Sequence, residues 1–207
     1  MRYHLSKEDF YTQKAKEENY PARSVYKLQE IDRKFGLLKQ GDKVLDLGAA
    51  PGSWLLYISR RVGPQGRVIG CDTEELKIEL PANATFIRQS VFEDFNRPLG
   101  SGSLFDVVLS DLAPQTSGLH EKDVALCLEL AGRAFEIARQ TLRPNGSFAV
   151  KLFEGEGVED YIKQVEQSFE IVKRYRPRAT RKGSREIYLV AKNYERQSTT
   201  GNNLVVE

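Results

Sequence analysis

Few residues in this chain can bind a metal or form a disulfide. The 207 residues include only two cysteines and two histidines. Cys71 and Cys127 lack the short spacing of a metal-binding or redox pair, so we expect both to be reduced packing residues. With only His4 and His120 besides, the sequence predicts no protein-built zinc site and no metal cofactor.

Long hydrophobic runs are also missing. No apolar stretch reaches the roughly 18 residues that a membrane-spanning helix needs, and residues 1–9 lack the apolar core of a signal peptide. We therefore expect a cytoplasmic protein without membrane contact. The net charge is only +2, so an anionic partner must be bound by local basic patches.

The length of the chain suits one α/β core and is too short for two comfortable domains. We predict a monomer with a single domain over residues 1–193. Residues 1–40 form an RNA-contacting helical segment in this prediction. The tail, 194–207, is rich in Ser, Thr, Asn and Gly, and we expect it to be disordered.

The most informative segment runs from Val44 to Trp54. Residues 43–47 form a short apolar run that predicts a buried strand, and Gly48 and Gly52 let a ligand approach the backbone where a helix begins. The turn lacks the middle glycine of the dinucleotide pattern G-x-G-x-x-G and carries Pro51, so it points away from NAD.

The next predicted strand, 66–71, ends at Asp72. This residue follows the glycines by about 20 positions, where a carboxylate accepts hydrogen bonds from ribose hydroxyls. Trp54 adds a flat apolar face to the intervening helix. Each feature alone is equally consistent with a tight structural loop, but together they favour a nucleoside-type cofactor.

Strands and helices alternate along the chain. This order predicts a doubly wound, mainly parallel α/β sheet with helices on both faces. The last two strands have no helix between them, so we expect one to be antiparallel. The predicted strands are 43–47, 66–71, 85–88, 105–110, 147–151 (after a turn at 143–146), 169–173 and 185–191, and the predicted helices lie near 28–35, 53–62, 124–142 and 158–168.

Two basic patches are candidates for nucleic-acid binding. In the first, within residues 11–34, tyrosines and acids are interleaved with the cations, so a solvated face and a base-stacking surface are equally plausible. The second, 173–185, contains no acid, and its density favours nucleic acid. Its cations are Lys173, Arg174, Arg176, Arg178, Arg181, Lys182 and Arg185; those of the first patch are Lys14, Lys16, Arg23, Lys27, Arg33 and Lys34, interleaved with Tyr11, Tyr20 and Tyr26.

Polar residues follow two of the predicted strands. Ligands of such sheets bind outside the carboxyl ends of the strands, where Asp111 and Lys151 fall. A lysine that ends an apolar strand is costly to bury without a partner, and Asp111 is the obvious one. The alternative is an ordinary ion pair at the rim of the sheet.

Five segments together resemble the FtsJ/RrmJ family of S-adenosylmethionine-dependent RNA ribose 2′-O-methyltransferases. The resemblance covers about residues 10–193. It implies the Rossmann-like class I methyltransferase fold with seven strands, S-adenosylmethionine as cofactor, and RNA as partner. The segments are Arg23-Ser-Val-Tyr-Lys-Leu28, Asp46-Leu-Gly-Ala-Ala-Pro-Gly-Ser-Trp54, Asp111-Leu-Ala-Pro114, Lys151-Leu-Phe-Glu-Gly-Glu-Gly157 and Ser184-Arg-Glu-Ile-Tyr-Leu-Val190.

The family's catalytic tetrad of two lysines and two acids falls on Lys27, Asp111, Lys151 and Glu186. The sulfonium methyl is already activated, so the protein must align a hydroxyl and remove its proton. Burial and a second nearby cation both disfavour the charged form of a lysine, which fits a lysine base. The resemblance places the cofactor against Gly48, Pro51, Gly52, Trp54, Asp72 and Asp111.

One position departs from the family pattern. Many members place an aspartate against the adenine amino group after the third strand, whereas this chain offers Ser90, a weaker acceptor. The resemblance favours a uridine of large-subunit (23S) ribosomal RNA as target. Ribose methylation in a transfer RNA anticodon loop is the alternative, and a non-catalytic RNA-binding assembly factor is the alternative of another class.

Overall fold

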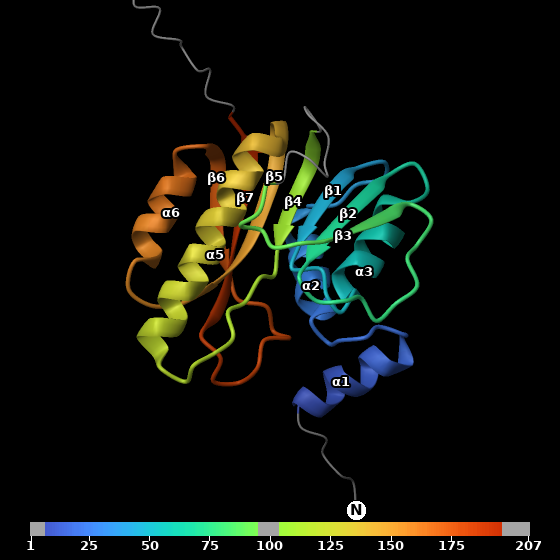
Figure 1. The fold of residues 1–207 in the computed structure, drawn as a ribbon, viewed down its shortest axis with the longest axis horizontal. Helices are drawn as coiled ribbons and strands as arrows, with labels where there is room; N and C mark the ends of the chain where they lie inside the picture. Colours follow the sequence, from blue (N-terminus) through green and yellow to red (C-terminus); the bar gives the residue numbers. More distant parts are fainter. Residues whose placement is uncertain (1–6, 95–103, 196–207) are drawn as a thin grey trace, which may run out of the picture.

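The fold is described from a computed structural model, for residues 7–94 and 104–195 (Figure 1). Seven strands form one sheet in the order β3-β2-β1-β4-β5-β7-β6. The strands are β1 (Lys43–Leu47), β2 (Arg67–Asp72), β3 (Ala84–Arg88), β4 (Phe105–Ser110), β5 (Leu142–Phe153), β6 (Phe169–Tyr175) and β7 (Glu186–Tyr194). The helices are α1 (Lys7–Glu17), α2 (Val25–Phe35), α3 (Ser53–Val62), α5 (His120–Thr141) and α6 (Val158–Glu166).

The first five strands pair in parallel, and β7 pairs antiparallel with both β5 and β6. This arrangement confirms the predicted doubly wound, mainly parallel sheet with one antiparallel strand near the C-terminus. The β5–β7 register sets Lys151 opposite Tyr188 and Phe153 opposite Glu186. The start of β7 therefore lies beside the end of β5.

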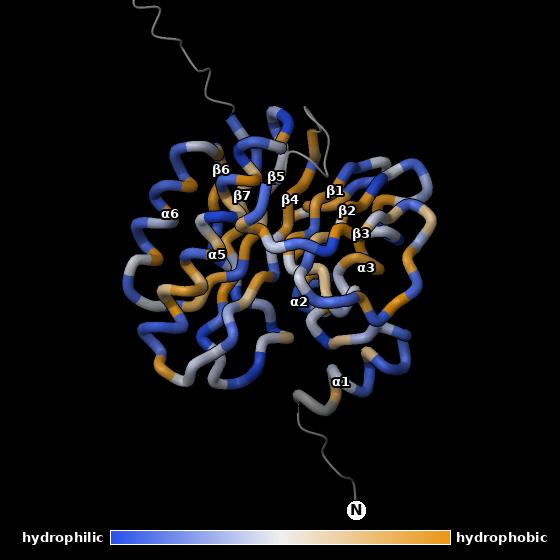
Figure 2. The backbone as a smooth tube through the Cα atoms, in the orientation of Figure 1, coloured by the Kyte–Doolittle hydropathy of each residue, from blue (hydrophilic) through white to orange (hydrophobic). Residues whose placement is uncertain are grey.

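Each face of the sheet carries its own apolar core. On one face α5 and α6 pack against the strands through residues such as Phe135, Tyr161 and Phe148. On the other, α2 and α3 contribute Leu28 and Ile58. Figure 1 shows these helix pairs on opposite faces, and Figure 2 shows that the hydrophobic chain is concentrated in the strands between them. The periodicity of the helices thus matches a sheet that is covered on both sides.

The structure differs from the sequence prediction around residues 143–146. The predicted turn lies inside β5, where the pairing with β4 shifts register between Phe105 and Val107. Asn145 there has a left-handed φ of 62°. Turn-forming residues therefore produce an irregularity in a long strand, which is a known alternative outcome for such residues.

The C-terminal boundary also moves. Tyr194 is the last residue of β7 and is buried against Phe169, with ring centroids 5.2 Å apart. The predicted disordered tail therefore begins too early at 194, and its residues 196–207 lie outside the described part of the chain. Within residues 7–94 and 104–195, no helix combines the length and apolar character that crossing a membrane requires.

Candidate active site

Asp111 and Lys151 meet where β4 and β5 end. Asp111 follows the last residue of β4, and Lys151 lies near the end of the adjacent β5, where only 6% of it is exposed. Its Nζ lies 3.2 Å from Oδ1 of Asp111 and donates a hydrogen bond of 2.6 Å to the Asp111 carbonyl oxygen. A buried amine thus has two acceptors on one residue, which offsets part of the cost of its burial.

Lys27 and Glu186 form a second pair at the same edge. Nζ of Lys27, on α2, lies 2.6 Å from Oε1 of Glu186, the first residue of β7. The Tyr188 hydroxyl, two residues further along β7, donates a 2.6 Å hydrogen bond to Oδ1 of Asp111. The four predicted tetrad residues therefore form two lysine–carboxylate pairs, and Tyr188 connects the strand of one pair to the acid of the other.

Charge and burial act in opposite directions on this cluster. Burial would raise the pKa of Asp111, but Lys151 and Lys27, with the Tyr188 hydrogen bond, outweigh it and hold that pKa below its ordinary value. Burial, followed by the charges of Asp111 and Glu186, raises the pKa of Tyr188 well above its usual range. Asp111 is therefore ionised and Tyr188 is a hydrogen-bond donor at neutral pH.

A cavity of about 350 Å³ opens beside Asp111. Its volume is in the range of small-molecule sites, roughly 300–1,000 Å³. Three acids line it and no lysine, arginine or histidine does, so it suits a cationic ligand and opposes a pyrophosphate. The lining residues are Gly48, Ala50, Asp72, Thr73, Glu74, Gln89, Ser90, Val91, Phe92, Asp111, Leu112, Ala113, Gln115 and Leu130.

Gly48 brings the turn after β1 against the loop that carries Asp111. It has a φ of +85°, and a Cβ added to it would lie 2.9 Å from the backbone nitrogen of Leu112. Asp72 holds the other side of the turn, since its carboxylate accepts hydrogen bonds from the N–H groups of Ala50 (2.9 Å) and Glu74 (3.0 Å). The turn is therefore fixed close to the catalytic edge.

Asp46 is a buried acid to which the sequence analysis assigned no role, and the charges of Asp111 and Asp72 act on it. Its side chain is completely buried in β1, and neither carboxylate oxygen has a hydrogen-bond partner among the described residues. Burial foremost, then the charges of Asp111 and Asp72, raise its pKa well above the usual value. An acid inside an otherwise apolar strand was the available signal, because such a position is costly without a function.

The remaining predicted cofactor residues divide into two groups. Ser90 lines the cavity, and its hydroxyl oxygen accepts a 3.3 Å hydrogen bond from the N–H of Phe92. Pro51, Gly52 and Trp54 are absent from the cavity lining. Trp54 is buried, and its ring lies 5.9 Å from that of Tyr188, which places it behind the tetrad as a support.

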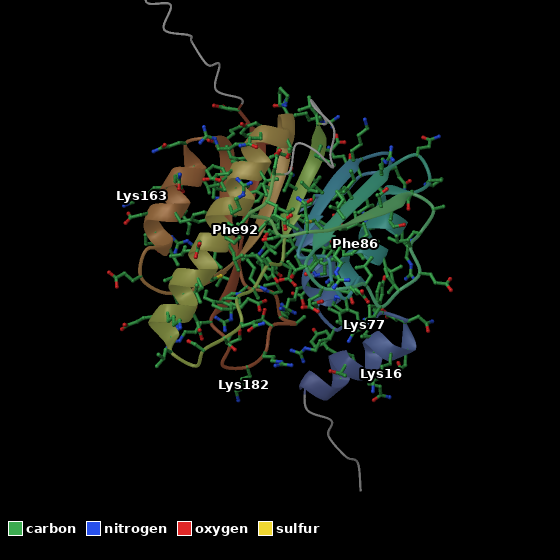
Figure 3. All side chains as sticks on the ribbon, in the orientation of Figure 1. Lys16, Lys77, Phe86, Phe92, Lys163 and Lys182 are labelled. Carbon is green, nitrogen blue, oxygen red and sulfur yellow. The ribbon has the colours of Figure 1, made fainter. Side chains whose placement is uncertain are left out.

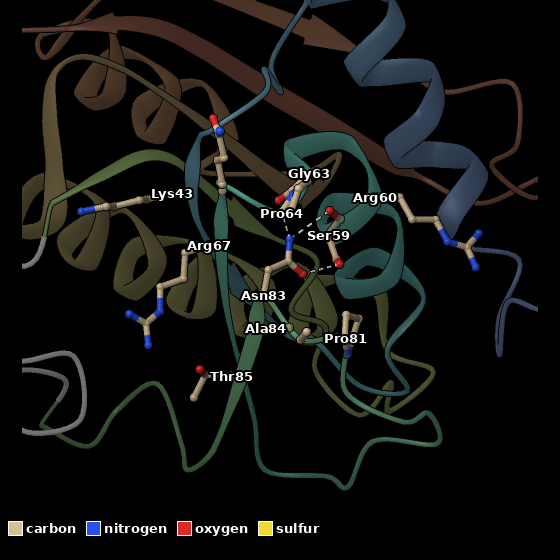
Figure 4. A pocket seen from close by; sticks show the side chains of 13 residues that line it. Lys43, Ser59, Arg60, Gly63, Pro64, Arg67, Pro81, Asn83, Ala84 and Thr85 are labelled. Carbon is tan, nitrogen blue, oxygen red and sulfur yellow. Dashed lines mark hydrogen bonds between the residues drawn. The ribbon is translucent and has the colours of Figure 1, made fainter.

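A larger cavity, of about 770 Å³, lies elsewhere and contains none of the predicted site residues (Figure 4). It opens at the amino ends of β1 and β2, beside Lys43 and Arg67, whereas the tetrad lies at the opposite edge of the sheet, where β4 and β5 end. Asn83 braces its wall through hydrogen bonds to Ser59 and Gly63. Size alone therefore does not locate the chemistry in this fold.

The two basic patches differ in how far their residues are buried. In the first, Tyr20 and Tyr26 are buried, and Lys14 and Arg60 cover their rings. The prediction of a base-stacking surface is therefore wrong for these rings, because they fill a small core between α1, α2 and Ala179.

The second patch is largely exposed. Arg174 and Arg176 are ion-paired, whereas Arg178, Lys182 and Arg185 have no ion pair within residues 7–94 and 104–195. Figure 3 shows Lys182 at the same end of the molecule as Lys16 of α1. The loop that carries Lys182 leads directly into Glu186 at the start of β7, so its exposed cations lie near the tetrad.

The fold and the site together define an S-adenosylmethionine-dependent methyltransferase. This cofactor carries a positive sulfonium and a positive amino group, which match a cavity lined by three acids and by no basic residue. When bound it supplies an activated methyl group. Among residues 7–94 and 104–195, no three His, Cys, Asp or Glu side chains gather as a metal-binding group.

The chain belongs to the FtsJ-like methyltransferase family, which matches residues 20–194. It is 46% identical to ribosomal RNA large subunit methyltransferase E of Nitratidesulfovibrio vulgaris over 195 residues, covering 93% of this chain and 96% of that protein. Its identity to the protein of the same name from Oleidesulfovibrio alaskensis is 46% over 190 residues, with 90% and 92% covered. A crystal structure described as a putative ribosomal RNA methyltransferase of Plasmodium falciparum has a TM-score of 0.74 at 28% identity, covering 84% of this chain and 98% of that one.

Proposed function

We propose that this enzyme transfers the methyl group of S-adenosylmethionine to the ribose 2′-hydroxyl of a uridine in large-subunit (23S) ribosomal RNA. The observation that carries the proposal is the convergence of Lys27, Asp111, Lys151 and Glu186 at one edge of the sheet, beside the cofactor cavity. Two relatives that are 46% identical to this chain are ribosomal RNA large subunit methyltransferases, which supports ribosomal RNA of the large subunit as the substrate.

The geometry around Lys151 suits removal of a hydroxyl proton. Two N–H groups of the Lys151 ammonium can be satisfied by the two acceptors of Asp111, and loss of the third proton would leave a lone pair for the substrate hydroxyl. The cofactor, when bound, would supply its methyl group to the 2′-oxygen as its C–S bond breaks toward sulfur, and the hydroxyl proton would pass to Nζ of Lys151. S-adenosylhomocysteine and the 2′-O-methyl ribose are the products.

The second pair would bind and orient the ribose. Lys27 and Glu186 come from α2 and β7, and both side chains are largely buried. A cation and a carboxylate held in fixed positions can keep a sugar hydroxyl in line with the methyl group. Alignment of this kind can supply a large part of the rate enhancement. In the cofactor cavity we assign Asp72 to the cofactor ribose and Ser90 to the adenine, on the basis of their place in the lining.

Mapping of 2′-O-methyl groups in RNA from cells with and without the gene tests the substrate. Loss of a methyl group from a uridine of large-subunit ribosomal RNA is the expected result. Loss only from a transfer RNA anticodon loop would overturn the assignment in favour of the alternative. Action as a monomer in the cytoplasm is part of the proposal, and light scattering of the purified protein and cell fractionation test it.

A matched pair of charge reversals tests the basic surface. Lys182→Glu adds a negative charge to the loop between β6 and β7, whereas Lys163→Glu changes an exposed lysine of α6 that pairs with Asp160 (Figure 3). We expect Lys182→Glu to weaken RNA binding and to reduce the salt dependence of binding, because fewer counterions are released. Equal effects of both substitutions would contradict a specific role for the loop.

A catalytic role is separated from a binding-only role by complementation. A Lys151→Ala protein that is folded and still binds RNA should fail to restore the methyl group and the growth of a deletion strain. Restoration of ribosome assembly by this variant would support the non-catalytic assembly factor instead.

A further inference from the structure

The basic loop, residues 176–185, is an ordered structure rather than a free cationic tail. Backbone hydrogen bonds from Thr180 to Pro177 (3.0 Å) and from Ser184 to Arg181 (3.1 Å) close two turns within it. The loop leads directly into Glu186, the first residue of β7. The loop is therefore directly connected to one member of the tetrad.

The buried acid Glu30 of α2 holds the first half of this loop. Its carboxylate accepts hydrogen bonds from the backbone N–H groups of Arg178 (2.7 Å) and Ala179 (3.1 Å) and from the Tyr175 hydroxyl (3.2 Å). Arg23 donates a 3.3 Å bond to the Ala179 carbonyl. Hydrogen bonds to a carboxylate are stronger than neutral ones, and these contact the backbone, so the Arg178 side chain remains exposed for a ligand.

The same helix also holds the far end of the loop. Lys27 precedes Glu30 by three residues, so the two side chains lie on one face of α2. Lys27 pairs with Glu186 at 2.6 Å. One helical face thus contacts the loop near its start and at the residue that follows its end.

We propose that Glu30 is a positioning residue that couples phosphate contact by the basic loop to the alignment of Lys27 and Glu186. It acts through the loop, since its carboxylate is bonded to loop backbone and to Tyr175. The RNA part of this inference rests on the proposed function. When the phosphates of an RNA contact the basic loop, the target ribose would therefore be held at a fixed position relative to Lys27 and Glu186, which orient it.

Glu30→Gln tests the proposal, because an amide keeps the shape but turns an NH₂ group toward a backbone N–H. We expect the KM for RNA to rise about tenfold and kcat to fall several-fold, since charge-assisted hydrogen bonds are lost. The Kd for S-adenosylmethionine, measured by calorimetry, should change by less than about twofold because its cavity is lined by other residues. Trypsin should cut the loop at its arginines and lysine faster, because loosened backbone is more open to proteases.

Asp32→Asn is the matched control. Asp32 is another buried acid of α2, but it accepts hydrogen bonds from Leu38, Tyr57 and Arg61, away from the basic loop. It should lower the melting temperature while leaving loop cleavage and the KM for RNA unchanged.

Two results would overturn the proposal: an unchanged cleavage rate in folded Glu30→Gln protein, or equal rises in KM for both variants. If the wild-type protein methylates no RNA, the proposed function fails, and the cleavage comparison still decides whether Glu30 holds the loop.

Discussion

Removing the charge of Lys151 should separate the stability of the site from its chemistry. Lys151→Met keeps most of the side-chain volume but leaves the ionised Asp111 with one hydrogen bond, from Tyr188, and without its nearest cation. Breaking a buried ion pair in this way costs about 3–5 kcal/mol. Because folding free energies are about 5–15 kcal/mol, the variant should remain folded but become much less stable to urea.

The double variant Lys151→Met with Asp111→Asn removes both charges. Uncharged replacements of a buried pair are often neutral or stabilising, so most of the lost stability should return. Methyl transfer should stay at least about 10²-fold below wild type in both variants, because general-base catalysis contributes about 10²–10⁴-fold. A radiolabelled-methyl assay and urea denaturation measure the two quantities. The reasoning fails if the single variant retains wild-type activity, or if the double variant is no more stable than the single one.

Three further predictions concern the cofactor side. Gly48→Ala should weaken S-adenosylmethionine binding at least about tenfold, because both its φ of +85° and a close contact with backbone oppose an added methyl group. Gly41→Ala is the control, since Gly41 has the same φ but open space around it, so only the backbone strain is added. Equal affinities of the two variants in calorimetry would refute this. Asp72→Asn should raise the cofactor Kd without changing kcat at saturation, because one of the two backbone N–H groups loses its acceptor, and a fall in saturated kcat would count against this role. The raised pKa of Asp46 means that the folded state retains a proton that the unfolded state releases, so the contribution of Asp46 to stability falls as pH rises above about 4. The stability gain of Asp46→Asn should therefore grow between about pH 4 and 8 in urea melts, and a gain that shrinks over this interval would disprove the assignment.

The elements of the sheet could be predicted because their signals are local. The segment 105–110, Phe-Asp-Val-Val-Leu-Ser, is rich in apolar and β-branched residues, and it forms β4 with the predicted limits. Residues 143–146 could not be predicted in the same way, since the choice between a turn and an irregular strand depends on pairing with β4, which is distant in sequence. Local propensity is a weak guide wherever tertiary contacts decide.

The site residues also divide into those with a signal in the sequence and those without one. The four residues of the tetrad came from the resemblance of motifs, and the pair of Lys151 with Asp111 was expected, whereas the pair of Lys27 with Glu186 was not. The roles of Tyr188 and Glu30 were not predicted, because a tyrosine in a strand and a glutamate in a helix carry no distinctive spacing. The burial of Tyr20 and Tyr26 was not predicted because aromatic residues between cations are typical of a base-stacking surface. In the structure both rings are packed in a small apolar core.

The antiparallel direction of β7 has a topological consequence. In a parallel sheet every strand delivers its last residue to the ligand edge, so a chain can supply that edge only from loops that follow strands. Because β7 runs the other way between β5 and β6, it delivers its first residue, Glu186, and the loop before it. A parallel β7 would have placed the basic loop at the opposite edge of the sheet, the edge where Lys43 and Arg67 begin β1 and β2. The reversal of this one strand therefore places the cofactor cavity and the basic loop at the same edge of the sheet.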